Sequence, residues 1–195
     1  MSNRQAYHIL HRLMNQTVSM PQICSLSCDE FTRVFGPVFE HSPWVAEVTW
    51  EQRPFESLEA LHSALCKTVR EASEAKQLEL ICAHPDLVGR AALAGTLTAP
   101  STAEQATAGL NTLTQEEIAT FQRYNQTYRE KFGFPFVICA RLNKKEAILT
   151  AFPIRLENSR QAEIQAALEE IYKIAYLRLK DIISVHGGEA EYSRS

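Results

Sequence analysis

The chain of 195 residues is long enough for one domain with a sizeable buried core, and 45% hydrophobic with 22% charged residues is typical of a globular protein. A net charge of −3 at pH 7 leaves no basic excess to neutralise phosphates, so we expect no nucleic-acid partner. The apolar runs are too short for a transmembrane helix and the first 20 residues lack a signal-peptide core, so we expect no membrane association and a cytoplasmic location.

The N-terminal third predicts short helices. Residues 1–20 place apolar side chains on one helical face but are otherwise polar, and we interpret them as an N-terminal extension. A capping box over 27–30 predicts a helix that ends at Gly36. Ser42 followed by Pro43 predicts the next helix, with Ser42 as its cap and Pro43 in its first turn.

Two further helices lead to a histidine. Ser57 begins a long amphipathic helix, and a second helix is predicted over 73–83. His84 follows directly and precedes Pro85; because proline disfavours helical backbone in the residue before it, we place His84 at a helix end. An imidazole can exchange a proton near neutral pH, but a histidine that merely interacts with terminal carbonyls fits the bare motif about equally well.

The next segment carries a carboxylate with two interpretations. Residues 89–100 are small and turn-rich and predict a loop, and a short helix is expected over 101–110. Ser101 to Glu104 matches a capping box, so Glu104 could bond the Ser101 amide or could serve as a catalytic carboxylate. Taken alone, the pattern favours the cap. The two roles are compatible, because the same helix start offers free amides to an anionic ligand.

The C-terminal third contains two predicted helix starts and one unusual segment. A capping box at Thr114 opens a long helix that ends at Gly133. The apolar stretch FGFPFVICARL (132–142) predicts a buried, extended or irregular segment. Helical periodicity returns over 145–157, and Asn158 with Gln161 is expected to cap the last long helix.

These elements together predict an all-α fold. About eight helices, one short extended segment and no βαβ alternation are consistent with a single-domain helical bundle. We expect this domain to span 21–185, with the last helix ending at 187–188 and a polar tail over 186–195.

Other candidate residues are less specific. Arg155 and Arg178 could each hold a carboxylate through two hydrogen bonds, although most arginines on helices are solvated or in surface pairs. His41 has no spacing that favours binding. The sequence lacks the common zinc, phosphate-loop, dinucleotide and nucleophile-elbow motifs, and its histidines are not clustered, so we expect no metal and no cofactor.

Several ordered blocks resemble one enzyme family. The chain is similar to 2-oxo-4-hydroxy-4-carboxy-5-ureidoimidazoline (OHCU) decarboxylases from about residue 25 to residue 179, and the ordered set is far more specific than any single block. The blocks are FEHSPWVAE (39–47), HPDLVGRAA (84–92), STAEQATAGL (101–110), YREKFGFPFVICA (128–140), RLEN (155–158) and EEIYKIAYLRL (169–179).

The resemblance implies an all-α, cofactor-independent enzyme, usually a homodimer, that converts OHCU to (S)-allantoin and carbon dioxide in urate degradation. It implies that His84 is the catalytic acid/base and Glu104 the catalytic carboxylate. The alternative is a non-catalytic helical protein that binds a ureide or acts as an adaptor on the same scaffold. The substrate-binding positions implied by the family are Pro85, Ser101, Thr102, Ala103, Glu104, Gln105, Phe136, Val137, Ile138, Cys139, Ala140 and Arg178.

Overall fold

The computed structural model describes residues 20–89, 92 and 94–183. Within these residues nine α-helices and two 3-10 helices form, without a strand, which confirms the all-α prediction. The predicted N-terminal extension (apart from Met20), the end of the last helix at 187–188 and the polar tail lie outside the described residues. The helices are α2 (Met20–Cys24), α3 (Cys28–Phe35), η1 (Gly36–Val38), α4 (Trp44–Trp50), α5 (Leu58–Glu71), α6 (Glu74–Cys82), α8 (Ala99–Thr107), α9 (Gln115–Phe132), η2 (Ala140–Leu142), α10 (Lys145–Leu156) and α11 (Arg160–Ile182).

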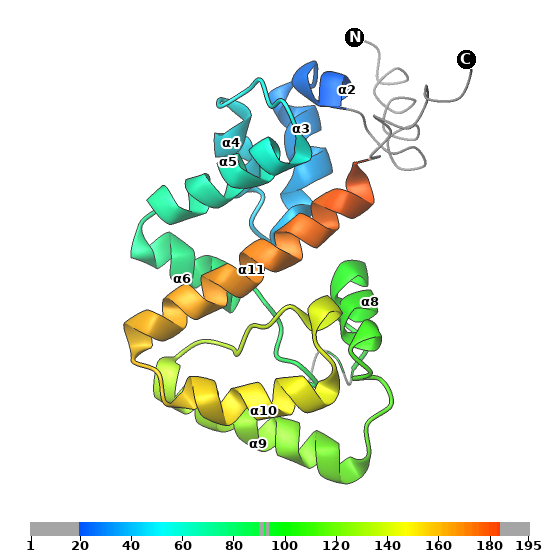
Figure 1. Ribbon diagram of the computed structural model, residues 1–195, viewed down its shortest axis with the longest axis vertical. Helices are drawn as coiled ribbons and strands as arrows, with labels where there is room; N and C mark the ends of the chain where they lie inside the picture. Colours follow the sequence, from blue (N-terminus) through cyan, green and yellow to red (C-terminus); the bar gives the residue numbers. More distant parts are fainter. Residues whose placement is uncertain (1–19, 90–91, 93, 184–195) are drawn as a thin grey trace, which may run out of the picture.

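Helix α11 crosses the middle of the molecule (Figure 1). It contacts α5, α6 and η1, while α3, α4 and α5 pack in sequence on one side of it. On the other side α9 packs against α10, and α8 contacts η2. One long buried helix therefore brings the two ends of the fold together.

Most predicted helix boundaries are confirmed. Ser27 accepts the Glu30 amide while the Glu30 carboxylate accepts the Ser27 amide at 2.9 Å, and Thr114 forms the same reciprocal box at the start of α9. Ser57 and Ser73 cap α5 and α6. Helix α9 ends at a left-handed glycine, as predicted, because a residue without a Cβ adopts that backbone conformation without a steric penalty.

Three of the predicted caps are wrong, those of α4, α11 and, at the candidate site, α8. Pro43, and not Ser42, occupies the cap position of α4, and no side chain caps that helix. Ser159 caps α11 by accepting the Ala162 amide, whereas Asn158 donates its side-chain amide to Glu163 at 2.7 Å. In the second case both Asn158 and Ser159 are residue types that can cap a helix. Because the Asn158 side chain binds the buried Glu163 carboxylate, Ser159 serves as the cap.

The segment between α9 and η2 is extended and buried, as predicted. Its aromatic side chains pack against α9 and α10: the rings of Phe136 and Phe152 stack with centroids 3.9 Å apart, and Tyr128 of α9 meets Phe136 edge-on at 5.2 Å. Phe134 and Phe136 are almost completely buried. This packing leaves the backbone of the segment next to α8 and α11.

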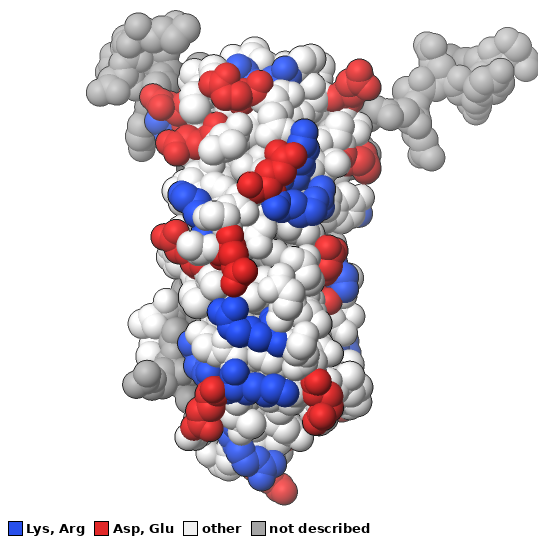
Figure 2. Space-filling model, turned by 90° about the vertical axis from the view of Figure 1, so that its left-hand side faces the viewer, with Lys and Arg blue, Asp and Glu red and all other residues white. Residues whose placement is uncertain are grey.

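The surface carries both signs of charge. On the face shown in Figure 2, acidic and basic side chains are interspersed, with a band of basic side chains in the lower half. None of the helices in the described part of the chain is both long and apolar enough to cross a membrane.

Candidate active site

Side chains from four parts of the chain line a small, partly open cavity of about 30 Å³. They come from α8, α11, the turn after α6 and the segment before η2. The lining residues are His84, Pro85, Leu87, Ser101, Glu104, Gln105, Phe136, Val137, Ile138, Ala140, Ile174 and Arg178. Most residues implied by the family resemblance therefore meet around one space.

His84 lies just after the C-terminal end of α6 and is buried. Its Nδ1 is 2.9 Å from the Leu80 carbonyl oxygen. Because a carbonyl oxygen can only accept a hydrogen bond, Nδ1 carries the proton and Nε2 presents its lone pair. Burial lowers the pKa of His84 to about 4; the hydrogen bond to Leu80 and the charge of Glu40 oppose this effect, while Arg178 and His41 add to it. The imidazole is therefore neutral at pH 7.

The turn that carries His84 is held from two sides. Val88 has a φ of 54°, a left-handed conformation that is unfavourable for a β-branched residue. Its amide donates to Gln105 Oε1 at 3.2 Å, and Asn125 Nδ2 donates to the Leu87 carbonyl at 2.7 Å. These contacts with α8 and α9 hold the strained turn, so that the position of His84 is fixed by elements outside α6.

Helix α8 begins earlier than expected. Its first residue is Ala99, its cap is Thr98, and Pro100 lies in its first turn. Ser101 is therefore inside the helix, and its amide donates to Thr98 Oγ1. The interpretation of Glu104 as part of a capping box is wrong, because its carboxylate is bound by an arginine instead.

The register of α8 separates the predicted binding residues. Ser101, Glu104 and Gln105 are three and four residues apart, so they share the face that lines the cavity. Thr102 and Ala103 are exposed on the opposite face. Their backbone belongs to the segment implied by the family resemblance, but their side chains do not reach the cavity.

Arg178 lies on α11 with 6% of its side chain exposed. Most arginines on helices are solvated, whereas this one is buried. Its Nε and Nη2 donate to the two oxygens of Glu104, each at 2.8 Å. Its Nη1 is 2.9 Å from Glu40 Oε2 and also donates to the carbonyls of Pro37 and Val38. A further bond from Nη2 to Ser101 means that all five guanidinium N–H groups face an acceptor.

Glu40 was not identified as a site residue from the sequence. It follows η1 and is 3% exposed. Oε1 accepts the Thr98 hydroxyl at 2.7 Å, and Oε2 accepts the Ser101 hydroxyl at 3.1 Å. Burial raises the pKa of Glu40, but the Thr98 hydrogen bond and the charge of Arg178 outweigh this and hold it below the usual value, so Glu40 is ionised at neutral pH.

Hydrogen bonds to side chains of α10 and α11 hold the backbone of residues 136–140. Arg155 Nη1 donates to the Val137 carbonyl at 2.6 Å, and Arg155 itself is paired with the fully buried Glu163. The Cys139 amide donates to Glu170 Oε2 at 2.8 Å. Cys139 consequently does not line the cavity, although its four neighbours in this segment do.

Polar groups of two residues at the cavity remain available. Gln105 Nε2 is buried without a hydrogen-bond partner among the described residues. Neither the N–H nor the C=O of Ile138 takes part in a hydrogen bond with another described residue. With His84 Nε2, these groups offer donors and acceptors around one small space, which is the pattern of a site for a polar, planar ligand.

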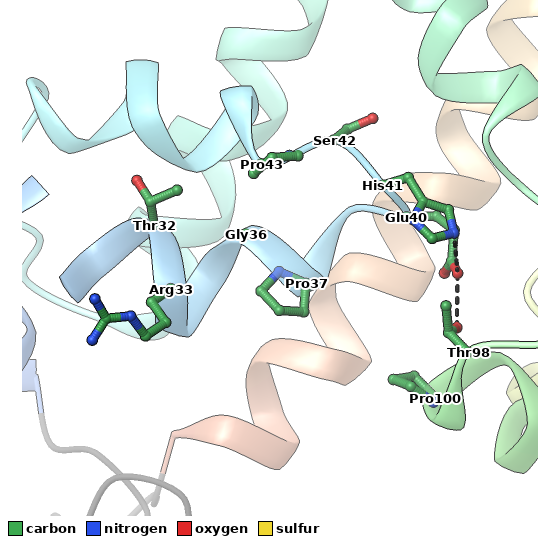
Figure 3. A pocket seen from close by; sticks show the side chains of 10 residues that line it. All are labelled: Thr32, Arg33, Gly36, Pro37, Glu40, His41, Ser42, Pro43, Thr98 and Pro100. Atoms are coloured by element: carbon green, nitrogen blue, oxygen red, sulfur yellow. Dashed lines mark hydrogen bonds and ion pairs between the residues drawn. The ribbon is translucent and has the colours of Figure 1, made fainter. Parts of the chain in front are cut away.

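A second, larger cavity borders Glu40. It has a volume of about 470 Å³ and a mostly apolar wall, and it is lined by residues of α3, the η1–α4 loop and the start of α8 (Figure 3). Glu40 and Thr98 contribute to it. In Figure 3 the His41 and Glu40 side chains extend toward Thr98 at the edge of this cavity.

Comparison with known proteins gives a consistent result. Residues 24–180 match the family model described as OHCU decarboxylase. Among curated relatives, the 2-oxo-4-hydroxy-4-carboxy-5-ureidoimidazoline decarboxylase of Haloferax volcanii is 44% identical over 167 residues, covering 86% of this chain and 97% of that protein. The protein of the same name from Amia calva is 45% identical, with coverages of 85% and 95%.

Two solved structures share the fold. A crystal structure of (S)-allantoin synthase matches with a TM-score of 0.70 and 30% identity, covering 86% of this chain and 54% of that chain. A crystal structure of OHCU decarboxylase in the presence of (S)-allantoin matches with a TM-score of 0.60 and 27% identity, covering 79% and 96%.

Proposed function

This chain belongs to the OHCU decarboxylase family, and we propose that it converts OHCU to (S)-allantoin and carbon dioxide in urate degradation. The observation that carries the proposal is His84: a neutral imidazole whose Nδ1 is committed to Leu80 and whose Nε2 is free beside Glu104 and Gln105. This arrangement suits general acid–base chemistry on a small ureide, because the base is unprotonated at neutral pH and lies in a cavity whose other polar groups can bind the ligand.

The reaction requires three proton transfers, two of which the protein must control. When the bond from C4 to the carboxylate breaks, its electron pair forms a C4–C5 double bond, and the ring nitrogen of the former C5–N double bond takes a proton from solvent. The C4 hydroxyl then becomes a carbonyl by losing its proton, and C5 gains one. We assign both of the latter transfers to His84 Nε2, so that delivery to a single face of C5 makes the product one-handed.

Glu104 and Arg178 act together in this proposal. Because every N–H of Arg178 already faces an acceptor, we assign Arg178 the role of holding Glu104 and not that of binding the substrate carboxylate. Glu104 in turn faces the cavity with His84 and orients the ureido group by accepting its N–H hydrogen bonds, since Nε2 of neutral His84 carries no proton that Glu104 could accept. A bidentate arginine–carboxylate pair gives such a side chain a defined direction.

Recognition of the substrate is assigned to groups that have no other partner. Gln105 Nε2 donates to a carbonyl oxygen of the ligand, and the main chain of Ile138 pairs with an amide-like edge. Pro85 and Phe136 supply apolar walls.

We also propose that the protein is a homodimer and acts in the cytoplasm, as the family resemblance implies. Sedimentation equilibrium at micromolar concentration tests the first part: a single species with the mass of one chain would rule out a stable dimer. Fractionation of the source cells tests the second part.

The test of the proposed function is stereochemical. OHCU generated enzymatically in the cuvette is followed by circular dichroism with the wild-type protein, with His84→Asn and with the control His62→Asn, which changes a half-buried histidine of α5. Asparagine at position 84 keeps a donor for the Leu80 carbonyl but offers no base, so we expect a loss of roughly 10²- to 10⁴-fold in rate and racemic product. Rapid formation of (S)-allantoin by a folded His84→Asn variant would exclude the proposed role, and an inactive wild-type protein would favour the non-catalytic alternative.

A further inference from the structure

We propose that Glu40 is a positioning residue of the active site, which holds the Arg178 guanidinium from the side opposite Glu104 and thereby fixes Glu104 beside the cavity. The proposal rests on the proposed function, because it assigns a role in that reaction to a residue that does not line the catalytic cavity itself. It is carried by the geometry of three buried charges that come from separate parts of the chain.

The guanidinium is suspended between two carboxylates. On one side Glu104 takes Nε and Nη2 at 2.8 Å each; on the other side Glu40 approaches Nη1 at 2.9 Å. The exposed fractions of the Glu40, Glu104 and Arg178 side chains are 3%, 12% and 6%. Buried ion pairs of this kind are poorly screened by solvent, so removing either acid shifts the force on the arginine toward the other.

Glu40 also determines where α8 sits relative to α11. Its two oxygens accept the hydroxyls of Thr98 and Ser101, which are the cap residue and an early residue of α8. Ser101 in turn accepts a bond from Arg178 Nη2 at 3.4 Å. One carboxylate therefore links the η1–α4 loop, α8 and α11, and Figure 3 shows the Glu40 side chain directed at Thr98.

The carboxylate acts on the catalytic imidazole as well. His84 is faced by Glu40 and His41 from the η1–α4 loop, by Arg178 from α11 and, across the cavity, by Glu104 from α8. Among these, the charge of Glu40 raises the pKa of His84, in opposition to burial and to Arg178. Glu40 therefore makes Nε2 a stronger base than burial alone would allow.

The decisive variant is Glu40→Gln, which keeps the size and one acceptor oxygen but removes the charge. We expect kcat to fall by about tenfold to a hundredfold, as when a catalytic group is displaced by about 1 Å, with KM changed by less than about threefold. The acid limb of the pH profile of kcat/KM should move to lower pH, because the pKa of His84 loses the support of a nearby negative charge. Glu40→Asp retains the charge and should leave that limb in place.

Two further variants separate positioning from structure. Glu47→Gln removes a charge from an exposed residue of the adjacent helix α4 and should leave kcat and the pH profile unchanged. If Glu40 acts through the guanidinium, Glu40→Gln should cause no additional loss of kcat in an Arg178→Gln background. That double variant also removes two opposite charges together, so it keeps the buried charge balanced if the single variant fails to fold.

Equal kcat and equal pH limbs for Glu40→Gln and Glu47→Gln, in a wild-type protein that forms (S)-allantoin rapidly, would overturn the role of Glu40. So would a full additional loss in the Arg178→Gln background. A wild-type protein that does not process OHCU contradicts the proposed function instead, so the two failures are distinguishable.

Discussion

The buried imidazole predicts a specific dependence of stability on pH. Burial lowers the pKa of His84 from about 6.5 in the unfolded chain to about 4 in the folded protein. Below pH 6.5 the unfolded chain therefore binds a proton that the folded protein does not, and the stability contributed by neutral His84 is lost as the pH falls from 6.5 to 4. The full effect is about 3 kcal/mol, of which about 2 kcal/mol is lost between pH 7 and pH 5.

Urea unfolding of the wild-type protein and of His84→Asn at pH 7 and pH 5 measures this directly. The other titrating groups are common to both proteins, so the difference between their pH dependences isolates His84. We expect the wild-type protein to lose about 2 kcal/mol more than the variant over this interval. Equal losses would show that the pKa of His84 is not lowered on folding and would contradict the reasoning from burial; a greater loss in the variant would show that this pKa is raised, and the assignment of Nε2 as a base at neutral pH would fall with it.

Two further substitutions test the supports of the site. Arg155→Met leaves the fully buried Glu163 without its cation and the Val137 carbonyl without its donor. We therefore expect urea unfolding to show a loss of about 3–5 kcal/mol in the free energy of unfolding. The exposed control Arg160→Met should lose less than about 1 kcal/mol. Gly89→Ala places a Cβ 2.7 Å from the Asp86 Cβ, in a turn that the Asp86–Arg129 ion pair already holds. Because this contact is too close, we expect the melting temperature to fall by several degrees and kcat to decrease. An unchanged melting curve would contradict this steric reasoning.

Local patterns in the sequence place the central residues on their elements, whereas the family resemblance implies their roles in the site. A proline after His84 places the histidine at a helix end, and spacings of three and four residues place Ser101, Glu104 and Gln105 on one helical face. The start of α8 was mispredicted even though the sequence holds the relevant signal: Pro100 suits the first turn of a helix, which makes Thr98 the better cap. Thr98 with Pro100 and Ser101 with Glu104 are two overlapping helix-start patterns, and the prediction followed the second, a capping box.

Glu40 could not be identified in this way, because its burial depends on contacts with residues far along the chain. Thr98 is 58 residues away, and the arginine it pairs with lies on the last helix. By local pattern alone, a glutamate in a loop is expected to be solvated. The neighbouring His41 was a weak candidate for binding because of its imidazole, but 70% of its side chain is exposed to solvent.

The charges around the cavity bear on how the proposed decarboxylation can proceed. Glu40 and Glu104 share one guanidinium, so with His84 neutral the cluster carries one formal negative charge. A substrate carboxylate beside this cluster is repelled, whereas carbon dioxide, as a neutral product, is not; the repulsion therefore diminishes as the carbon–carbon bond breaks. Protonation of His84 would cancel the negative charge of the cluster and would also remove the base. The repulsion of the substrate carboxylate and the base catalysis by Nε2 should therefore be lost over the same pH range, and we expect a single acid limb in the pH profile of kcat/KM.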